Sequence, residues 1–177
     1  MSVVYNMQLS VPANKIIRKF AQDNGIIGGA PNSIPVPIWP STYEKMPDLP
    51  DQIIGFYLSS AINDGQMMAT GEPVVHPVVQ IMARSKTNDS CYALLMQLNN
   101  LFIGINSSQI VDITGFDNLA KKFKLWSASP ISNIAPLGSE RLDNFTQGNQ
   151  RIPRESIKLD RSLYSMNYRF TITEEDA

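Results

Sequence analysis

The residues able to do covalent chemistry are few, and their spacing argues against a catalytic site. His76 is the only histidine, so a Ser-His-Asp or Cys-His arrangement would have to use it. It precedes Pro77 in an apolar segment with no candidate nucleophile nearby. The single cysteine, Cys91, falls on the apolar stripe of an expected helix, where a thiol behaves as a small hydrophobic side chain. We therefore expect no catalytic role for His76 and a packing role for Cys91.

Phosphate, acid–base and metal chemistry have little more support. Gly25, Gly28 and Gly29 are followed by Ala-Pro-Asn-Ser, not by a helix carrying Lys-Ser/Thr as in a phosphate-binding loop. No two carboxylates are expected on one strand face as a general acid and base would need. The carboxylates between residues 44 and 72 flank the proline-rich segment or an expected turn: Glu44, Asp48, Asp51, Asp64 and Glu72. With no Cys/His cluster for structural zinc, we expect no catalytic residue, no cofactor and no metal.

Basic and tryptophan side chains are the better candidates for a binding role. Several basic residues are expected on the polar face of one sheet, yet Trp126 is the only aromatic among them, which makes a poor nucleic-acid platform. A solvated or subunit-facing surface is the alternative. Tryptophan is enriched at contact anchors, although core packing explains each tryptophan equally well. The candidate subunit or partner interface is Trp39, Arg84, Lys122, Lys124, Trp126, Arg141, Arg151, Arg154 and Arg169.

Length and composition fit one folded domain, residues 1–177, with a mass of 19.7 kDa. The net charge of −1 gives no general reason to expect a polyanionic partner. Charged residues make up 18%, below the roughly 25% of an average domain. No apolar run is long enough to cross a bilayer, and the N-terminal residues lack the pattern of a signal peptide, so we expect a cytoplasmic chain.

The first half of the chain predicts one helix, an irregular segment and two strands. Pro12 to Asn24 has the apolar spacing and end signals of a helix. Residues 25–50 hold six prolines and predict an extended segment, in which Val36, Ile38 and Trp39 form a short edge pairing. Residues 52–60 and 73–84 predict an antiparallel pair, with turns at 63–65 and 70–71. Because Pro77 cannot donate to a ladder, the second strand should start at a sheet edge or carry a bulge.

The second half predicts a long helix and further strands. Residues 88–102 have apolar side chains at helical spacing, preceded by cap residues from Thr87 onward. Strands are expected at 109–113, 121–128, 131–135 and 164–173, and a long polar loop at about 137–162. The expected class is α+β, an antiparallel or mixed sheet with two main helices packed on it and two long irregular loops.

This order of elements resembles the tail terminator (tail completion) proteins of long-tailed bacteriophages. The likeness rests on Pro77–Arg84, similar to that family's strand leading into residues 88–102, and on the closing strand Tyr168–Ile172. It spans roughly residues 12–135 and 163–173, and the polar stretch 137–162 departs from the family pattern.

The resemblance implies a structural virion protein and not an enzyme. Such subunits form a ring, expected to be a hexamer of the chain with itself, which caps the tail tube and joins the tail to the head-neck complex. The implied partners are the tail tube protein and a neck or connector protein, with DNA only as passing cargo and no membrane. The implied place is the head-proximal end of the virion tail, after assembly in the host cytoplasm. Another neck, tail or baseplate role is the main alternative, followed by a small binding module and an enzyme.

Overall fold

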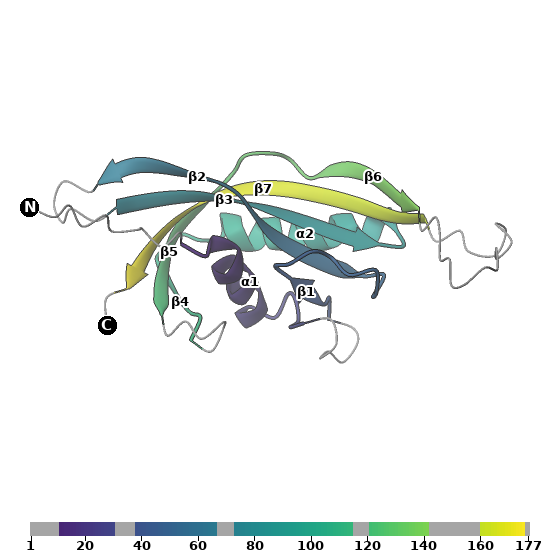
Figure 1. Cartoon of the computed structure of the whole chain (residues 1–177), viewed down its shortest axis with the longest axis horizontal. Helices are drawn as coiled ribbons and strands as arrows, with labels where there is room; N and C mark the ends of the chain where they lie inside the picture. The colour runs from purple at the N-terminus through teal and green to yellow at the C-terminus, as the bar shows by residue number, and fades with distance from the viewer. Residues whose placement is uncertain (1–10, 31–37, 67–72, 115–120, 142–159, 176–177) are drawn as a thin grey trace, which may run out of the picture.

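The computed structural model describes residues 11–30, 38–66, 73–114, 121–141 and 160–175, with the backbone alone at 60–66, 73–75, 140–141 and 160 (Figure 1). Two helices and seven strands follow one another in these residues. In chain order they are α1 (Ala13–Asp23), β1 (Ser41–Thr42), β2 (Ile53–Gln66), β3 (Pro73–Ser85), α2 (Asn88–Ile103), β4 (Gln109–Asp112), β5 (Lys122–Pro130), β6 (Ala135–Arg141) and β7 (Asp160–Glu175).

The strands form one mixed sheet in the order β1-β2-β3-β7-β5-β4, with β6 paired to β7. The β1–β2 pair is parallel and the other pairs are antiparallel. β7 is long enough to pair with β6 through its first half and with β5 through its second. Both helices lie on the same side of this sheet (Figure 1). The expected α+β class with two packed helices is therefore confirmed.

Helix α1 begins and ends where the sequence predicts. Pro12 occupies the N-cap, and Gly25, with a φ of 71°, follows the C-cap Asn24. The Gly25 and Ile26 amides donate back to the carbonyls of Gln22 and Ala21, the Schellman arrangement that a left-handed glycine permits. The buried side of α1 contacts β2, β3 and β4. Because β2 and β4 lie toward opposite edges of the sheet, the sheet curls around this helix.

Helix α2 is capped by Thr87, whose hydroxyl oxygen accepts from the Ser90 amide at 3.4 Å. Its inward residues are fully or almost fully buried against β3, β5 and β7. They are Cys91, Leu94, Leu95, Leu98 and Phe102. The apolar spacing read from the sequence therefore identifies the buried face of this helix correctly.

An aromatic cluster joins α2 to the central strand β7. The Phe102 ring lies 5.1 Å from the ring of Tyr168 and 5.2 Å from that of Phe170, the second contact edge to face. All three side chains are buried. Offset and edge-to-face aromatic pairs contribute about 0.5–1.5 kcal/mol beyond their burial. The cluster therefore fixes α2 on the sheet.

In the β2–β3 pair the expected turn at 63–65 is wrong, and of the two alternatives for Pro77 the sheet edge is wrong while the bulge has a counterpart in the facing strand. Residues 63–65 form no turn, because β2 continues to Gln66 and Asn63 pairs with Val75. Pairing along a second strand outweighs the local turn preference of Asn-Asp-Gly. β3 is not at an edge either, since it lies between β2 and β7. The irregularity near Pro77 is a register shift in the facing strand, between Leu58 and Ser60.

The irregular segments are shorter than the sequence indicates. β6 runs from Ala135, where the expected strand at 131–135 should end, and β7 begins at Asp160, so strands occupy both ends of the predicted loop 137–162. In the proline-rich segment Trp39 forms a parallel bridge with Ile27, just before β1. Val36 and the turn at 70–71 lie outside the described residues. Within the described part, neither helix is long and apolar enough to cross a membrane.

Candidate subunit interface

Four of the candidate interface residues lie on the side of the sheet opposite the helices, here called the open face. In β5 the side chains of Phe123 and Leu125 are buried, so Lys122, Lys124 and Trp126 alternate outward. Arg169 is exposed on β7, whose neighbours Tyr168 and Phe170 point into the core. The predicted alternation of β5 is thus found in the structure, and the four residues share one face, although Arg169 pairs with Ser129 at the far end of β5 from Lys122.

The lysines near this face are partly neutralised by acidic residues at the end of β7. Lys124 Nζ lies 3.3 Å from a Glu175 oxygen, and Lys121 Nζ lies 2.6 Å from a Glu174 oxygen. Trp126 is 48% exposed, and its indole N–H donates to Thr173 at 2.8 Å. The strongest feature here is a fixed, half-exposed tryptophan beside paired charges, which favours a protein partner over a polyanion.

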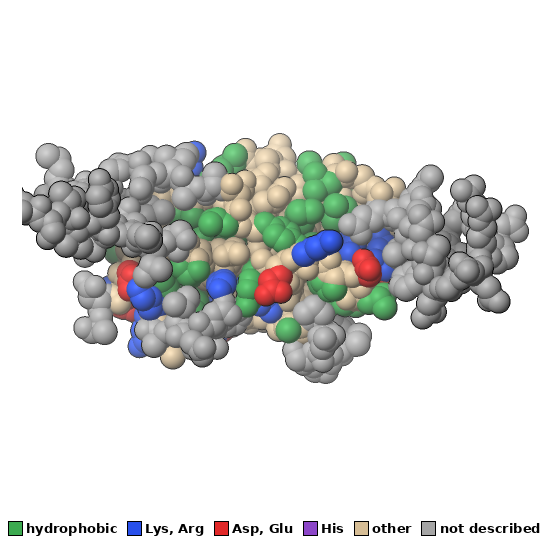
Figure 2. All heavy atoms as spheres, viewed as in Figure 1, with side chains coloured by type: hydrophobic (Ala, Val, Ile, Leu, Met, Phe, Trp, Pro, Cys, Tyr) green, Lys and Arg blue, Asp and Glu red, His purple; other side chains and the backbone are tan. Residues whose placement is uncertain are grey.

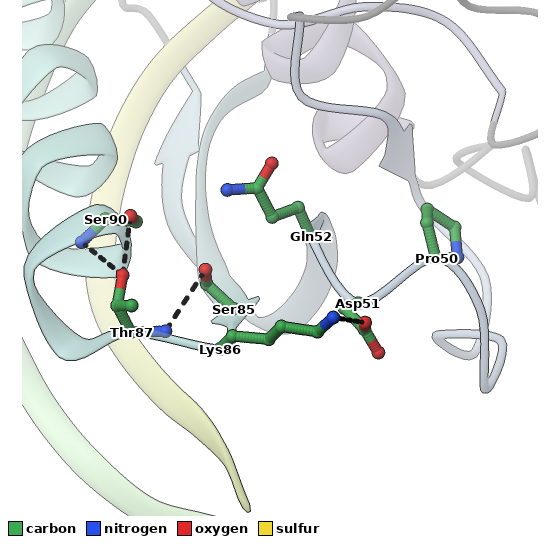
Figure 3. A pocket seen from close by; sticks show the side chains of 7 residues that line it. All are labelled: Pro50, Asp51, Gln52, Ser85, Lys86, Thr87 and Ser90. Carbon is green, nitrogen blue, oxygen red and sulfur yellow. Dashed lines mark hydrogen bonds and ion pairs between the residues drawn. The ribbon is translucent and has the colours of Figure 1, made fainter. Parts of the chain in front are cut away.

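His76 takes part in a hydroxyl chain on the same face. The Ser127 hydroxyl lies 3.0 Å from Thr171 Oγ1, which lies 3.2 Å from His76 Nδ1. The sequence alone did not place a hydroxyl beside His76. This hydroxyl chain lies along strand faces, and none of its three residues lines the pocket of Figure 3.

Arg84 is not a surface residue of the chain, which corrects its place among the interface candidates. It is only 2% exposed, and its guanidinium donates to the carbonyls of Pro47, Asp48 and Pro50. Carbonyls of the irregular segment thus satisfy a charge that would be costly to bury unpaired. Arg84 fastens this loop to β3.

Arg161 of β7 holds the same loop and was missed in the sequence. It is 1% exposed, donates to the Asp48 carbonyl at 2.6 Å, and lies 2.7 Å from an Asp51 carboxylate oxygen. Hydrogen bonding from Lys86, followed by the charges of Arg161 and Lys86, lowers the pKa of Asp51 although burial opposes this. We call Arg84, Arg161 and Asp51 the loop clasp. No local sequence pattern indicates the loop clasp, because its contacts with the loop join residues more than 30 positions apart.

A pocket of about 320 Å³ lies beside the loop clasp, between the start of β2 and the start of α2. Figure 3 shows Lys86 and Asp51 pointing toward each other across it, 2.9 Å apart, while Thr87 is engaged with Ser90. The side chains of Asp51, Lys86, Thr87 and Ser90 are thus engaged in contacts within the fold. Among the described residues no group of histidine, cysteine and carboxylate side chains is placed to bind a metal.

The remaining candidates are scattered. Trp39 is half-buried and packs against the core on the helix side, so it does not share the open face. Arg141 ends β6, where its backbone pairs with Asp160. Arg151 and Arg154 lie outside the described residues.

Cys91 has the packing environment expected for it. Its side chain is buried, and its sulfur lies 3.5 Å from the carbonyl oxygens of Ala83 and Ser162. Burial raises the pKa of the thiol to about 11. A thiol with so high a pKa is a poor nucleophile at neutral pH.

Comparison with known proteins identifies a family. No curated protein matches the chain. A family model described as bacteriophage tail terminator protein matches residues 19–116, which is more than half of the 177 residues. The match runs from within α1 through β4 and includes the strand and long helix on which the resemblance was based. The family is structural and not enzymatic, and it places its members in the virion tail. The chain belongs to the bacteriophage tail terminator protein family.

Proposed function

We propose that the chain is the subunit of a ring that caps the head-proximal end of the phage tail tube and joins the tail to the head-neck complex. The observation that carries the proposal is the family match over α1 to β4. The ring is proposed to be a hexamer of this chain, in contact with the tail tube protein on one side and a neck or connector protein on the other. DNA passes through as cargo, and assembly takes place in the host cytoplasm.

The surface chemistry supports a role in assembly. Among the described residues Asp51 forms ion pairs with Lys86 beside the pocket and with Arg161 in the loop clasp, and the Ser127 and Thr171 hydroxyls are hydrogen-bonded to each other. Several large apolar side chains are about half exposed or more, among them Ile103, Trp126 and Ile131. Exposed apolar groups of this kind are typical of protein contacts. A closed ring needs two different contact patches on each subunit.

The solution mass tests the proposal. Light scattering should give a particle of six 19.7-kDa chains, about 118 kDa, either for the purified chain or when tail tube protein is added. A chain that remains monomeric at every concentration, and does not associate with tail tube protein, would contradict both the ring and its place on the tube.

A further inference from the structure

The outward side of α2 is unusual because it carries charge only in its first turn, at the exposed Asp89. Residues 90–111 contain no Asp, Glu, Lys, Arg or His. At the chain's average of 18%, 22 residues would carry about four charged side chains. α1 is an internal contrast, since Lys19 and Asp23 form an ion pair on its outer side. The lack of charge over residues 90–103 is therefore a property of this surface and not of every helix in the chain.

Beyond Asp89, this side of α2 presents large apolar groups to solvent. Ile103 is 62% exposed and Tyr92 is 49% exposed, with Met96 half-buried between them. Alanine and amide side chains fill the rest. We define the helix surface as Tyr92, Ala93, Met96, Gln97, Asn100 and Ile103. Interfaces are depleted in Lys and Glu and enriched in Tyr and Met, so this composition indicates a surface that another protein covers.

The composition also restricts what covers it. Away from Asp89, a charged surface placed on these residues would lose hydration without gaining an ion partner, which is costly. The covering surface must therefore itself be nearly uncharged and partly apolar.

The chain carries such a surface elsewhere. Residues 125–139, from within β5 through the link and into β6, also contain no charged residue, although the exposed Arg169 pairs with Ser129 and the Lys124–Glu175 ion pair lies beside Trp126. Trp126, Ile131 and Leu137 are each about half exposed in it. The link is anchored because Ser132 Oγ accepts hydrogen bonds from the backbone and side-chain nitrogens of Asn167. We define the arch surface as Trp126, Ser129, Ile131, Asn133 and Leu137.

The two surfaces lie on opposite sides of the molecule. In Figure 1 the link and β6 run above β7, whereas α2 lies below it. Figure 2, in the same view, shows mainly apolar and uncharged side chains along the central upper edge, while most of the charged side chains lie lower in the picture. Two patches on opposite sides of a subunit cannot contact each other in a two-fold symmetric dimer. When one patch of each copy binds the other patch of the next copy, the copies form a ring if successive rotations return to the first copy.

We propose that the helix surface of one copy packs on the arch surface of the next copy. This rests on the proposed ring function and names the two surfaces that form the subunit contact. The contact is heterologous, with Tyr92 and Trp126 as its aromatic anchors.

Three matched substitutions test the assignment. Ile103→Lys places a charge on the helix surface and Ile131→Lys places one on the arch surface. Leu49→Lys is the control, because Leu49 is 68% exposed and belongs to neither surface. All three positions are half exposed or more, so the fold tolerates them. The first two should raise the concentration for half-assembly about a hundredfold or more, and the control should leave it unchanged.

A mixing experiment tests the front-to-back arrangement. A chain with Ile103→Lys keeps its arch surface, and one with Ile131→Lys keeps its helix surface. Tagged Ile103→Lys protein should therefore retain untagged Ile131→Lys protein on an affinity resin, but not untagged Ile103→Lys protein. Retention of neither, or of both equally, would overturn the heterologous contact.

The outcome for the wild-type chain separates this inference from the proposed function. Assembly is measured under the condition, with or without tail tube protein, that gives the wild-type ring. If wild type and all three variants form rings equally, the surfaces are wrong while the ring stands. If wild type forms no ring in either condition, the proposed function and the contact both fail.

Discussion

Replacing Phe102 by alanine should remove a large share of the stability of the fold. The side chain is fully buried, and its ring contacts Tyr168 and Phe170 at 5.1 and 5.2 Å, which joins α2 to β7. Phe→Ala changes at such sites cost about 3–5 kcal/mol. Domains unfold with only about 5–15 kcal/mol. The neighbouring Ile103 is 62% exposed, so Ile103→Ala should cost no more than about 0.5 kcal/mol.

Urea unfolding followed by circular dichroism measures this difference. With a slope of about 2 kcal/mol per molar, a loss of about 4 kcal/mol lowers the midpoint by about 2 M. Because Ile103 belongs to the helix surface, both variants are compared at one low concentration where light scattering shows monomers. A Phe102→Ala midpoint no lower than that of Ile103→Ala would refute the placement of α2 on the sheet.

Three further predictions concern buried polar and thiol groups. Arg161→Gln should lower the free energy of unfolding in urea by about 3–5 kcal/mol, because it leaves Asp51 without its buried partner. Lys86→Gln, at the exposed end of the same group, should lower it by less than about 1 kcal/mol. Equal losses for the two variants would contradict the loop clasp. Since the pKa of Asp51 is lowered in the folded chain, its contribution is present above the unfolded value of 3.8 and is lost as pH falls below it. Asp51→Asn should therefore flatten the acid limb of a stability–pH curve, and an unchanged limb would count against the shift. With its pKa raised to about 11, Cys91 should resist a thiol reagent at pH 8 and react once the chain unfolds in urea; rapid labelling of the folded chain would contradict its burial.

The elements that follow from local periodicity could be predicted from the sequence. The two helices, their caps and the closing strand show apolar spacing or alternation that one stretch of chain carries by itself. The turn at 63–65 could not be excluded, because its pairing with β3 is a tertiary contact. The interior position of the Pro77 strand could not be predicted either, because it depends on pairing with β7, about 90 residues later in the sequence.

The candidate interface could be predicted only in part. Alternation placed Lys122, Lys124 and Trp126 on one face of β5. It also placed Arg84 outward, and only the return of the 47–50 loop buries that side chain. The helix surface was visible as a run without charge, but which residues of α2 remain exposed is settled by packing.

The central claim is tested most directly by the lengths of tail tubes that polymerise in the presence of this protein. Negative-stain microscopy of polymerising tail tube protein should show that the chain stops elongation, giving shorter tubes with one ring at a single end. Ile103→Lys protein, with its helix surface disrupted, should leave tube length close to that without the chain, whereas Leu49→Lys should act as wild type does. Tubes of unchanged length in the presence of wild-type protein, or protein bound along the tube walls and not at an end, would contradict the terminator role.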